Sequence, residues 1–167
     1  MVTFRRSNRQ YEAMDEAEVW AFISSLTKMI VTFSMPDGYP HATPVWFVLR
    51  EGKIYFRSQM NKTKSRLAGN GKVCCVFEDG EKYTEQRGCI VWGECKPLEP
   101  GPITANVEAL LGQKYGGLRW GAGDMPSWWI SDRTKDTRVY FEITPAKVSS
   151  WDNRKLSAMS ERPSRRP

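Results

Sequence analysis

Apolar residues recur in short runs along this chain, separated by turn-forming residues, and this pattern divides most of it into strands. Pro36-Asp37-Gly38 and Glu51-Gly52 provide two of the tight turns. We expect strands at 29–35, 40–49, 53–58, 73–78, 89–96, 137–144 and 147–151. Six or seven antiparallel strands, joined by turns and interrupted by short helices, predict a mainly β fold, a closed β-barrel with α-helices.

Three segments show helical patterns instead. Asp15 can cap a helix over 15–27, because Glu18, three residues later, completes a capping box. The apolar face of this helix consists of Val19, Phe22, Ile23 and Leu26. Further helices are expected at 61–68, before Gly69-Asn70-Gly71, and at 103–114.

The chain of 167 residues suits one domain, and no internal repeat or linker divides it. We expect three segments: an N-terminal arm over 1–13, a barrel domain over 14–156 and a disordered basic tail over 157–167. Removing 1–10 and 157–167 is expected to change stability and cofactor content little. Of the net charge of +6, +3 lies in 1–10 and +2 in 157–167. The body therefore lacks the basic face of a nucleic-acid-binding domain, and no nucleic-acid partner is expected.

Nothing in the sequence indicates a membrane or a secretory route. No stretch approaches the roughly 20 apolar residues of a membrane-spanning helix. The N-terminus lacks the apolar segment of a secretion signal, so a cytoplasmic location without a membrane partner is expected.

The cysteines do not suggest a metal site. They form no CxxC pair, and the chain has a single histidine, so no bound metal is expected. We interpret them as buried free thiols in strands, with two adjacent ones on opposite faces. They are Cys74, Cys75, Cys89 and Cys95.

The basic segment after the third expected strand is a candidate phosphate site. Asn61 or Thr63 can cap the helix at 61–68, whose free N–H groups and positive end attract an anion. A solvated basic helix face would show the same residues, so composition alone leaves both interpretations open. The side chains that could contact a phosphate are Arg57, Ser58, Lys62, Lys64 and Arg66.

Pro44 lies in the middle of the strand expected at 40–49. Proline has no N–H to donate to a sheet, so it marks an edge strand or a bulge. A ladder broken there would free the backbone groups of Thr43, Val45 and Trp46 for the edge of a flat, hydrogen-bonding ring such as isoalloxazine. A plain edge strand would also explain the proline.

Two further features have open roles. His41, the single histidine, could donate a proton or bind haem iron, although an exposed structural histidine is the commoner outcome at a strand start. The segment 115–130 holds four glycines and three tryptophans. It is expected either to fill the core with its tryptophans or to cover a pocket, including that of a partner subunit.

In order and spacing, these motifs resemble the pyridoxamine 5′-phosphate oxidase-like superfamily, over 14–100 closely and 139–151 more loosely. Its members are split β-barrels that bind FMN or a deazaflavin, usually as homodimers. The resemblance rests on DGYPHATPVWF (37–47), KIYFRS (53–58), KTKSRL (62–67), VCCVFE (73–78) and KYTEQRGCIVWGECKPLE (82–99).

The resemblance implies a six- to seven-stranded antiparallel split β-barrel with FMN, or alternatively the deazaflavin F420, as cofactor. The residues implied to run beside the flavin ring are Thr43, Pro44, Val45 and Trp46. Those implied to hold its phosphate are Arg57, Ser58, Lys64 and Arg66. One departure is Leu67, which follows Arg66 where many relatives carry asparagine.

The function expected from these features is that of a flavin- or deazaflavin-dependent oxidoreductase acting on a small planar substrate. The cofactor would carry the chemistry, which explains why no acid, base or nucleophile stands out. The alternative is a flavin- or haem-binding barrel without turnover. Oxidation of pyridoxamine phosphate itself is disfavoured, because the body shows no second basic cluster. A homodimer is expected, since seven tryptophans are many for a small monomer to bury.

Overall fold

The computed structural model describes residues 2–5, 13–60, 62, 71–116 and 137–157. Apart from Lys62, the helix expected at 61–68 lies outside the described residues, as does the tail from 158 onward. The elements follow in the order β1 (Thr3–Arg5), α1 (Glu16–Ser25), β2 (Met29–Ser34), β3 (Pro40–Val45), β4 (Phe47–Arg50), β5 (Lys53–Gln59), β6 (Gly71–Asp79), β7 (Arg87–Leu98), α3 (Pro102–Tyr115), β8 (Arg138–Asp152) and α5 (Arg154–Ser157).

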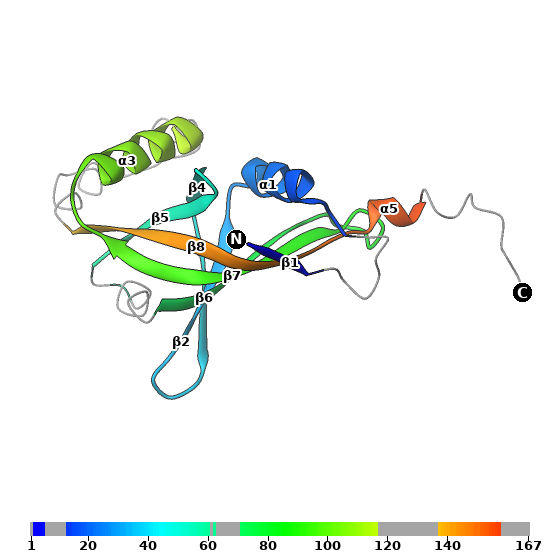
Figure 1. The fold of residues 1–167 in the computed structure, drawn as a ribbon, viewed down its shortest axis with the longest axis horizontal. Coiled ribbons are helices and arrows are strands. Elements are labelled where there is room, and N and C mark those ends of the chain that lie inside the picture. Colours follow the sequence, from blue (N-terminus) through cyan, green and yellow to red (C-terminus); the bar gives the residue numbers. More distant parts are fainter. Residues whose placement is uncertain (1, 6–12, 61, 63–70, 117–136, 158–167) are drawn as a thin grey trace, which may run out of the picture.

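The sheet closes on itself because one bent strand supplies both of its ends. The strand order is β3-β2-β6-β7-β8-β5-β4, and neighbouring strands in it are antiparallel. β3 and β4 stand at opposite ends of this order, yet only Trp46 separates them in the chain. The sheet must therefore curl, and Figure 1 shows its strands crossing in a curved half-barrel. The predicted mainly β, split-barrel architecture is confirmed.

Aromatic side chains fill the inside of the curled sheet. Phe56 and Phe141 stack with ring centroids 4.9 Å apart, and Phe47 meets Phe77 edge-on at 5.2 Å. These four rings are at most 1% exposed, and the apolar face of α1 packs against the same core. Because a ring-sized ligand would have to displace this core, a binding site is expected on the outer surface of the barrel.

α1 forms as the sequence predicts. The Glu18 N–H donates to Asp15 Oδ1, and the Asp15 N–H donates to Glu18 Oε2, both at 2.8 Å, which completes the capping box. The helix ends at Ser25, slightly before the expected end at Thr27. In the described part of the chain, no helix is long and apolar enough to cross a membrane.

β8 corrects the expectation of two strands separated at Pro145. It runs without interruption from Arg138 to Asp152. The ladder with β7 shifts register between Trp92 and Gly93, so that Gly93 faces Pro145. This irregularity accommodates the proline, which cannot donate a ladder hydrogen bond, and the strand continues past it.

The N-terminal arm is also more integrated than the sequence suggests. Thr3–Arg5 forms β1, which pairs in parallel with β8. Val2 and Phe4 pack against the barrel core. The expectation that the first residues contribute little to the core is therefore wrong for this short segment.

The described cysteines are free, as predicted, and they lie in β6 and β7. Cys74 is half-buried and its neighbour Cys75 is buried, which confirms that they occupy opposite faces of β6. Cys89 and Cys95 are buried in β7, and burial raises the pKa of each thiol to about 12. Such thiols are poor nucleophiles, which supports a packing role.

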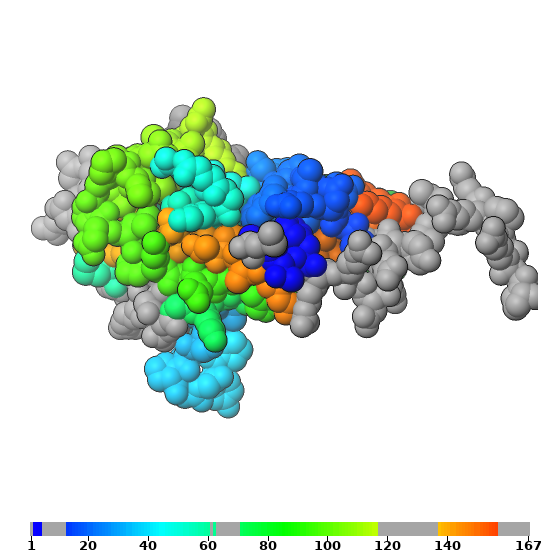
Figure 2. Space-filling model, viewed as in Figure 1, coloured from blue at the N-terminus to red at the C-terminus, as the bar shows by residue number. Residues whose placement is uncertain are grey.

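α3 lies outside the barrel, against β4 and β5 (Figure 1). Its buried residues Val107, Leu111 and Tyr115 pack on Val48 and Tyr55, forming a second apolar cluster. The barrel thus has one outer face covered by α3 and another, on β3, β2, β6 and β7, that no helix in the described residues covers. Figure 2 shows the β2–β3 hairpin projecting from the body of the molecule.

Candidate functional site

β3 is an edge strand, and the backbone nitrogen of each of its prolines faces the open edge rather than β2. It pairs with β2 along its whole length without a register shift. The Met35 N–H donates to Tyr39 O at 2.8 Å, and antiparallel pairs alternate between hydrogen-bonded and non-hydrogen-bonded positions. Counting from that bond, Pro44 lies opposite Ile30 at a non-hydrogen-bonded position, where the missing N–H breaks no ladder bond.

Of the two interpretations of Pro44, the structure shows the plain edge strand and not the broken ladder. The same alternation directs the N–H groups of Thr43 and Val45 toward β2. The Val45 side chain is also buried in the barrel core. What this edge can offer a ligand is the Ala42 N–H and the carbonyl groups of Ala42 and Pro44.

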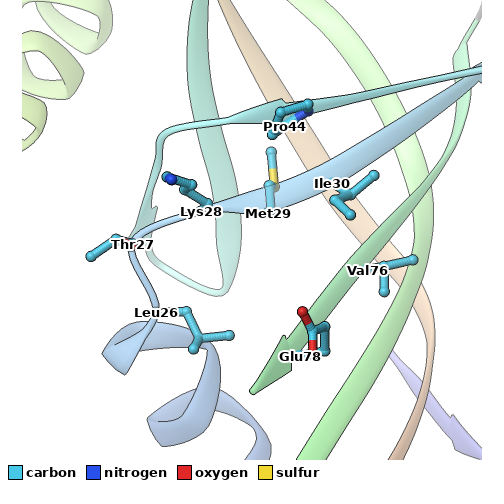
Figure 3. Close-up of a pocket in the computed structure, with 8 residues that line it drawn as sticks. All are labelled: Leu26, Thr27, Lys28, Met29, Ile30, Pro44, Val76 and Glu78. Atoms are coloured by element: carbon cyan, nitrogen blue, oxygen red, sulfur yellow. The ribbon is translucent and has the colours of Figure 1, made fainter. Parts of the chain in front are cut away.

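A pocket of about 320 Å³ opens beside Pro44, between the end of α1 and the outer surface of β2 and β6 (Figure 3). One row across three strands supplies much of its apolar lining, with Pro44 opposite Ile30 and Ile30 opposite Val76. An apolar pocket of this size with a few polar groups is typical of small-molecule sites. Its lining residues are Leu26, Thr27, Lys28, Met29, Ile30, Pro44, Val76 and Glu78.

The bend at Trp46 is held by Tyr115, the last residue of α3. The Phe47 N–H, just past the bend, donates to the Tyr115 hydroxyl at 3.0 Å. That hydroxyl lies 2.7 Å from Phe47 O and 2.9 Å from Thr27 O, and its single proton can go to either. The Trp46 ring stacks on the Tyr115 ring at 4.6 Å with an interplanar angle of 1°. Tyr115 therefore joins α3, the bend and the pocket wall at Thr27.

Lys114 brings a positive charge to the same end of the barrel. Its Nζ lies 4.0 Å from the centre of the Phe47 ring, close enough for a cation–π interaction. Burial lowers the pKa of this lysine. The bend therefore combines an aromatic stack with a partly desolvated ammonium group.

Arg57 and Ser58 end up on opposite faces of β5. Successive side chains of a strand alternate, so Arg57 faces α3 while Ser58 faces the barrel interior and is 7% exposed. The Ser58 hydroxyl donates to Gln59 O at 3.3 Å. The sequence suggested that both side chains converge on one phosphate, but the structure does not bring them together.

Arg57 instead belongs to a cluster around Glu108 of α3. Arg57 Nη1 lies 2.7 Å and 2.8 Å from the two Glu108 carboxylate oxygens. Arg138 Nη1 donates to Glu108 Oε1 at 3.0 Å, and the Tyr140 hydroxyl donates to Oε2 at 2.9 Å. Burial, together with the hydrogen bond to Glu108, raises the pKa of Tyr140. One carboxylate thus receives two guanidinium groups and a phenol.

A second carboxylate, Glu142, is held in a similar way but deeper. Lys53 and Lys96 approach it at 2.9 Å and 3.2 Å, and the Tyr55 hydroxyl donates to it at 3.0 Å. Burial alone would raise the pKa of Glu142, but these hydrogen bonds together hold it below its ordinary value. Because Glu142 is 4% exposed, this cluster is a structural connection between β5, β7 and β8.

Other predicted residues fall outside these contacts. Lys64 and Arg66 lie outside the described residues, as does the part of the glycine- and tryptophan-rich segment beyond Gly116. His41 is half-buried in β3, opposite Phe33 of β2. Its proposed roles in proton transfer or haem binding remain predictions.

Sequence reasoning missed Arg138, Tyr140, Glu108 and Tyr115. Arg138 comes beside Arg57 only because β5 pairs with β8, with Arg57 opposite Tyr140 and Gln59 opposite Arg138. No local spacing carries this information. A signal was available for Tyr115 alone, since it extends the apolar face of the helix expected at 103–114 by four residues from Leu111.

Comparison with known proteins agrees with this fold. The family model described as pyridoxamine 5′-phosphate oxidase matches residues 15–152. The chain belongs to the pyridoxamine 5′-phosphate oxidase family. No curated protein matches the sequence of this chain.

Solved structures are similar to this chain over most of its length. The conserved hypothetical protein Rv2991 from Mycobacterium tuberculosis has a TM-score of 0.76 at 25% identity, covering 96% of both chains. A FAD-binding protein from Mycobacterium smegmatis has a TM-score of 0.61 at 16% identity, covering 84% of this chain and 98% of that one. An F420 reductase has a TM-score of 0.58 at 20% identity, covering 77% and 94%. The last two similarities show a shared fold.

Removing the Tyr115 hydroxyl should destabilise the protein. Tyr115→Phe keeps the ring stack on Trp46 but leaves the Phe47 N–H without its partner. We expect the free energy of unfolding to fall by about 1–3 kcal/mol, measured by urea denaturation.

A matched control is Tyr39→Phe, because Tyr39 is 72% exposed. This variant should stay within about 0.5 kcal/mol of wild type. Equal, small effects of the two substitutions would show that the Tyr115 hydroxyl does not hold the bend.

Proposed function

We propose that this protein binds a phosphorylated flavin or deazaflavin on the outside of the barrel and uses it to oxidise or reduce a small planar substrate. The observation that carries the proposal is a path along the outer surface from an apolar pocket to a pair of arginines. Pro44 and Trp46 lie two residues apart on the bent strand. Continuing the β4–β5 register past Phe47 and Phe56 places Trp46 beside Arg57.

The chemistry of this surface suits such a cofactor. A flat ring can lie on the apolar pocket and meet the backbone groups along the β3 edge, and an anionic phosphate can meet guanidinium groups. In the proposal, Thr43, Pro44, Val45 and Trp46 run beside the ring. The backbone contacts to the ring come from Ala42 and Pro44, because the N–H groups of Thr43 and Val45 face β2 and the Val45 side chain is buried.

The phosphate would lie at the end of β5. Arg57 and Arg138 are the described cations there. Lys64 and Arg66 of the following basic segment would complete the clamp. Ser58 is not part of this clamp, because its side chain faces the barrel interior and its backbone is paired with Val139 of β8.

When bound, the cofactor supplies the hydride or electron transfer, while the chain binds it, orients it and limits access of water. Two of the similar structures support this assignment, since one is a FAD-binding protein and another an F420 reductase. The proposal covers FMN and F420 alike, because each presents a tricyclic ring and a phosphate.

The direct test is to identify what copurifies with the protein, by visible spectrum and mass spectrometry, and to titrate FMN and F420 into the apoprotein. Reduction of the bound cofactor followed by substrate-dependent reoxidation would establish an oxidoreductase. Binding without reoxidation by any planar acceptor would favour a flavin-binding protein without turnover. A Soret band would favour haem binding, and no binding of any of these compounds would overturn the proposal.

Lys64→Ala should weaken cofactor binding more than it weakens the fold. A charge-assisted hydrogen bond to phosphate contributes on the order of 1.5–3 kcal/mol, so the dissociation constant should rise about tenfold to a hundredfold. Fluorescence titration with FMN and with F420 measures this change.

The matched control is Lys72→Ala, at an exposed lysine at the start of β6. It should leave both dissociation constants unchanged. If Lys64→Ala behaves like this control for both cofactors, Lys64 does not belong to the phosphate site.

We also propose that two copies form a homodimer through the uncovered sheet face. The register places Ile30 opposite Val76 and Val76 opposite Ile90, so an apolar row crosses this face. Ile30 is 40% exposed, and an uncovered apolar sheet face is typical of an interface. An obligate interface of this kind would bury more than roughly 2,000 Å² in total.

Light scattering should therefore report a dimer at micromolar concentration, and Ile30→Glu should shift it toward the monomer. Ile103→Glu is a matched control, since Ile103 is 46% exposed but lies on α3. A stable wild-type monomer with cofactor bound would contradict this assembly.

A further inference from the structure

Glu108 occupies a position that an anionic ligand could take. Arg57 and Arg138 each donate to it through Nη1. We propose that these two arginines form an exchangeable anion site, in which Glu108 is the resident anion and the phosphate group of a ligand is its competitor. The inference rests on the proposed phosphate site at the end of β5 and adds to it a mechanism of regulation.

The charges and donors of the cluster favour exchange. Two guanidinium groups face one carboxylate, and each reaches it through Nη1 alone, although a guanidinium carries five N–H donors. The arginine side chains are 24% and 22% exposed, so a ligand can reach them from solvent. A phosphate carries up to two negative charges and three acceptor oxygens, and so can engage both guanidinium forks.

The place of the cluster in the fold also fits. Gln59, the last residue of β5, lies opposite Arg138, the first residue of β8. The Met60 N–H donates to Thr137 O at 2.8 Å, so the end of β5 lies beside the start of β8. A phosphate bound at the end of β5 would therefore lie close to both arginines.

Exchange would be coupled to α3. Glu108 lies in the middle of this helix, and its displacement removes the polar contacts to β5 and β8 described above. Val107, Leu111 and Tyr115 would stay packed in the second apolar cluster. Phosphate binding should therefore loosen the exposed positions in the first half of α3, while Val107 stays anchored and the C-terminal half keeps holding the bend at Trp46.

Removing the competitor is the decisive experiment. Glu108→Gln removes the carboxylate charge that competes with phosphate, so a larger fraction of the protein has both arginines available to a ligand. We expect inorganic phosphate and FMN each to bind about tenfold more tightly or better, measured by isothermal titration calorimetry, since a charge-assisted contact no longer has to be broken. Riboflavin, which has the ring but no phosphate, should bind wild type and Glu108→Gln equally.

Hydrogen exchange supplies a second readout. In wild type, phosphate should increase amide exchange in the first half of α3. In Glu108→Gln this exchange should already be high and should not respond to phosphate. Tyr140→Phe, which removes one donor from Glu108 but keeps both arginines, should raise phosphate affinity in the same direction by a smaller factor.

Two variants serve as controls. Arg138→Gln should weaken phosphate binding in the wild-type and Glu108→Gln backgrounds. Glu51→Gln frees the single guanidinium of Arg50, which Glu51 contacts at 3.0 Å, and should not change phosphate affinity.

Unchanged or weaker phosphate binding by both Glu108→Gln and Tyr140→Phe would overturn the inference and leave Glu108 as a structural anchor of α3. If FMN binds all variants equally, the proposed cofactor function stands and the exchange fails. If phosphate responds as expected but no flavin or deazaflavin binds, the exchange stands and the cofactor proposal fails.

Discussion

The barrel closes where one strand changes partners, and this constraint organises much of the molecule. At Trp46 the chain leaves the ladder with β2 and enters the ladder with β5, so the backbone at the bend belongs to neither. A buried N–H without a partner is costly, and the Tyr115 hydroxyl provides the partner for Phe47. Because the same hydroxyl reaches Thr27 beside the pocket, barrel closure, the position of α3 and the shape of the pocket depend on one side chain.

Two carboxylates with the same kinds of neighbours have different consequences. Glu142 is almost completely buried between lysines and Tyr55, and its pKa is lowered despite burial, so it behaves as a fixed charge that connects three strands. Glu108 is 30% exposed and meets arginines, whose planar forks suit oxyanions in general. The greater exposure of Glu108 and its arginine partners thus suit it to exchange with a ligand, whereas the buried Glu142 keeps its lysine partners.

The sequence predicted what depends on local periodicity and spacing. The capping box at Asp15, the strand pattern and the opposite faces of Cys74 and Cys75 follow from such rules. The continuous β8 did not, because Ala146, the extra residue that lets the strand pass Pro145, is recognisable only from the pairing of β8 with β7. The arginine cluster was equally hidden, since it depends on which distant strand pairs with β5, and strand alternation separates the Arg57 and Ser58 side chains.

The strand order has a consequence for how the protein is made. β8 lies between β7 and β5 in the sheet, but it is the final strand of the described chain. During synthesis, the β3-β2-β6-β7 sheet and the β4–β5 hairpin have no strand to join them, and β7 and β5 each present an unpaired edge. β1, near the other end of the described chain, also pairs with β8. Folding of the barrel is therefore dominated by contacts between distant segments, and the nascent chain carries two open edges until β8 has been synthesised.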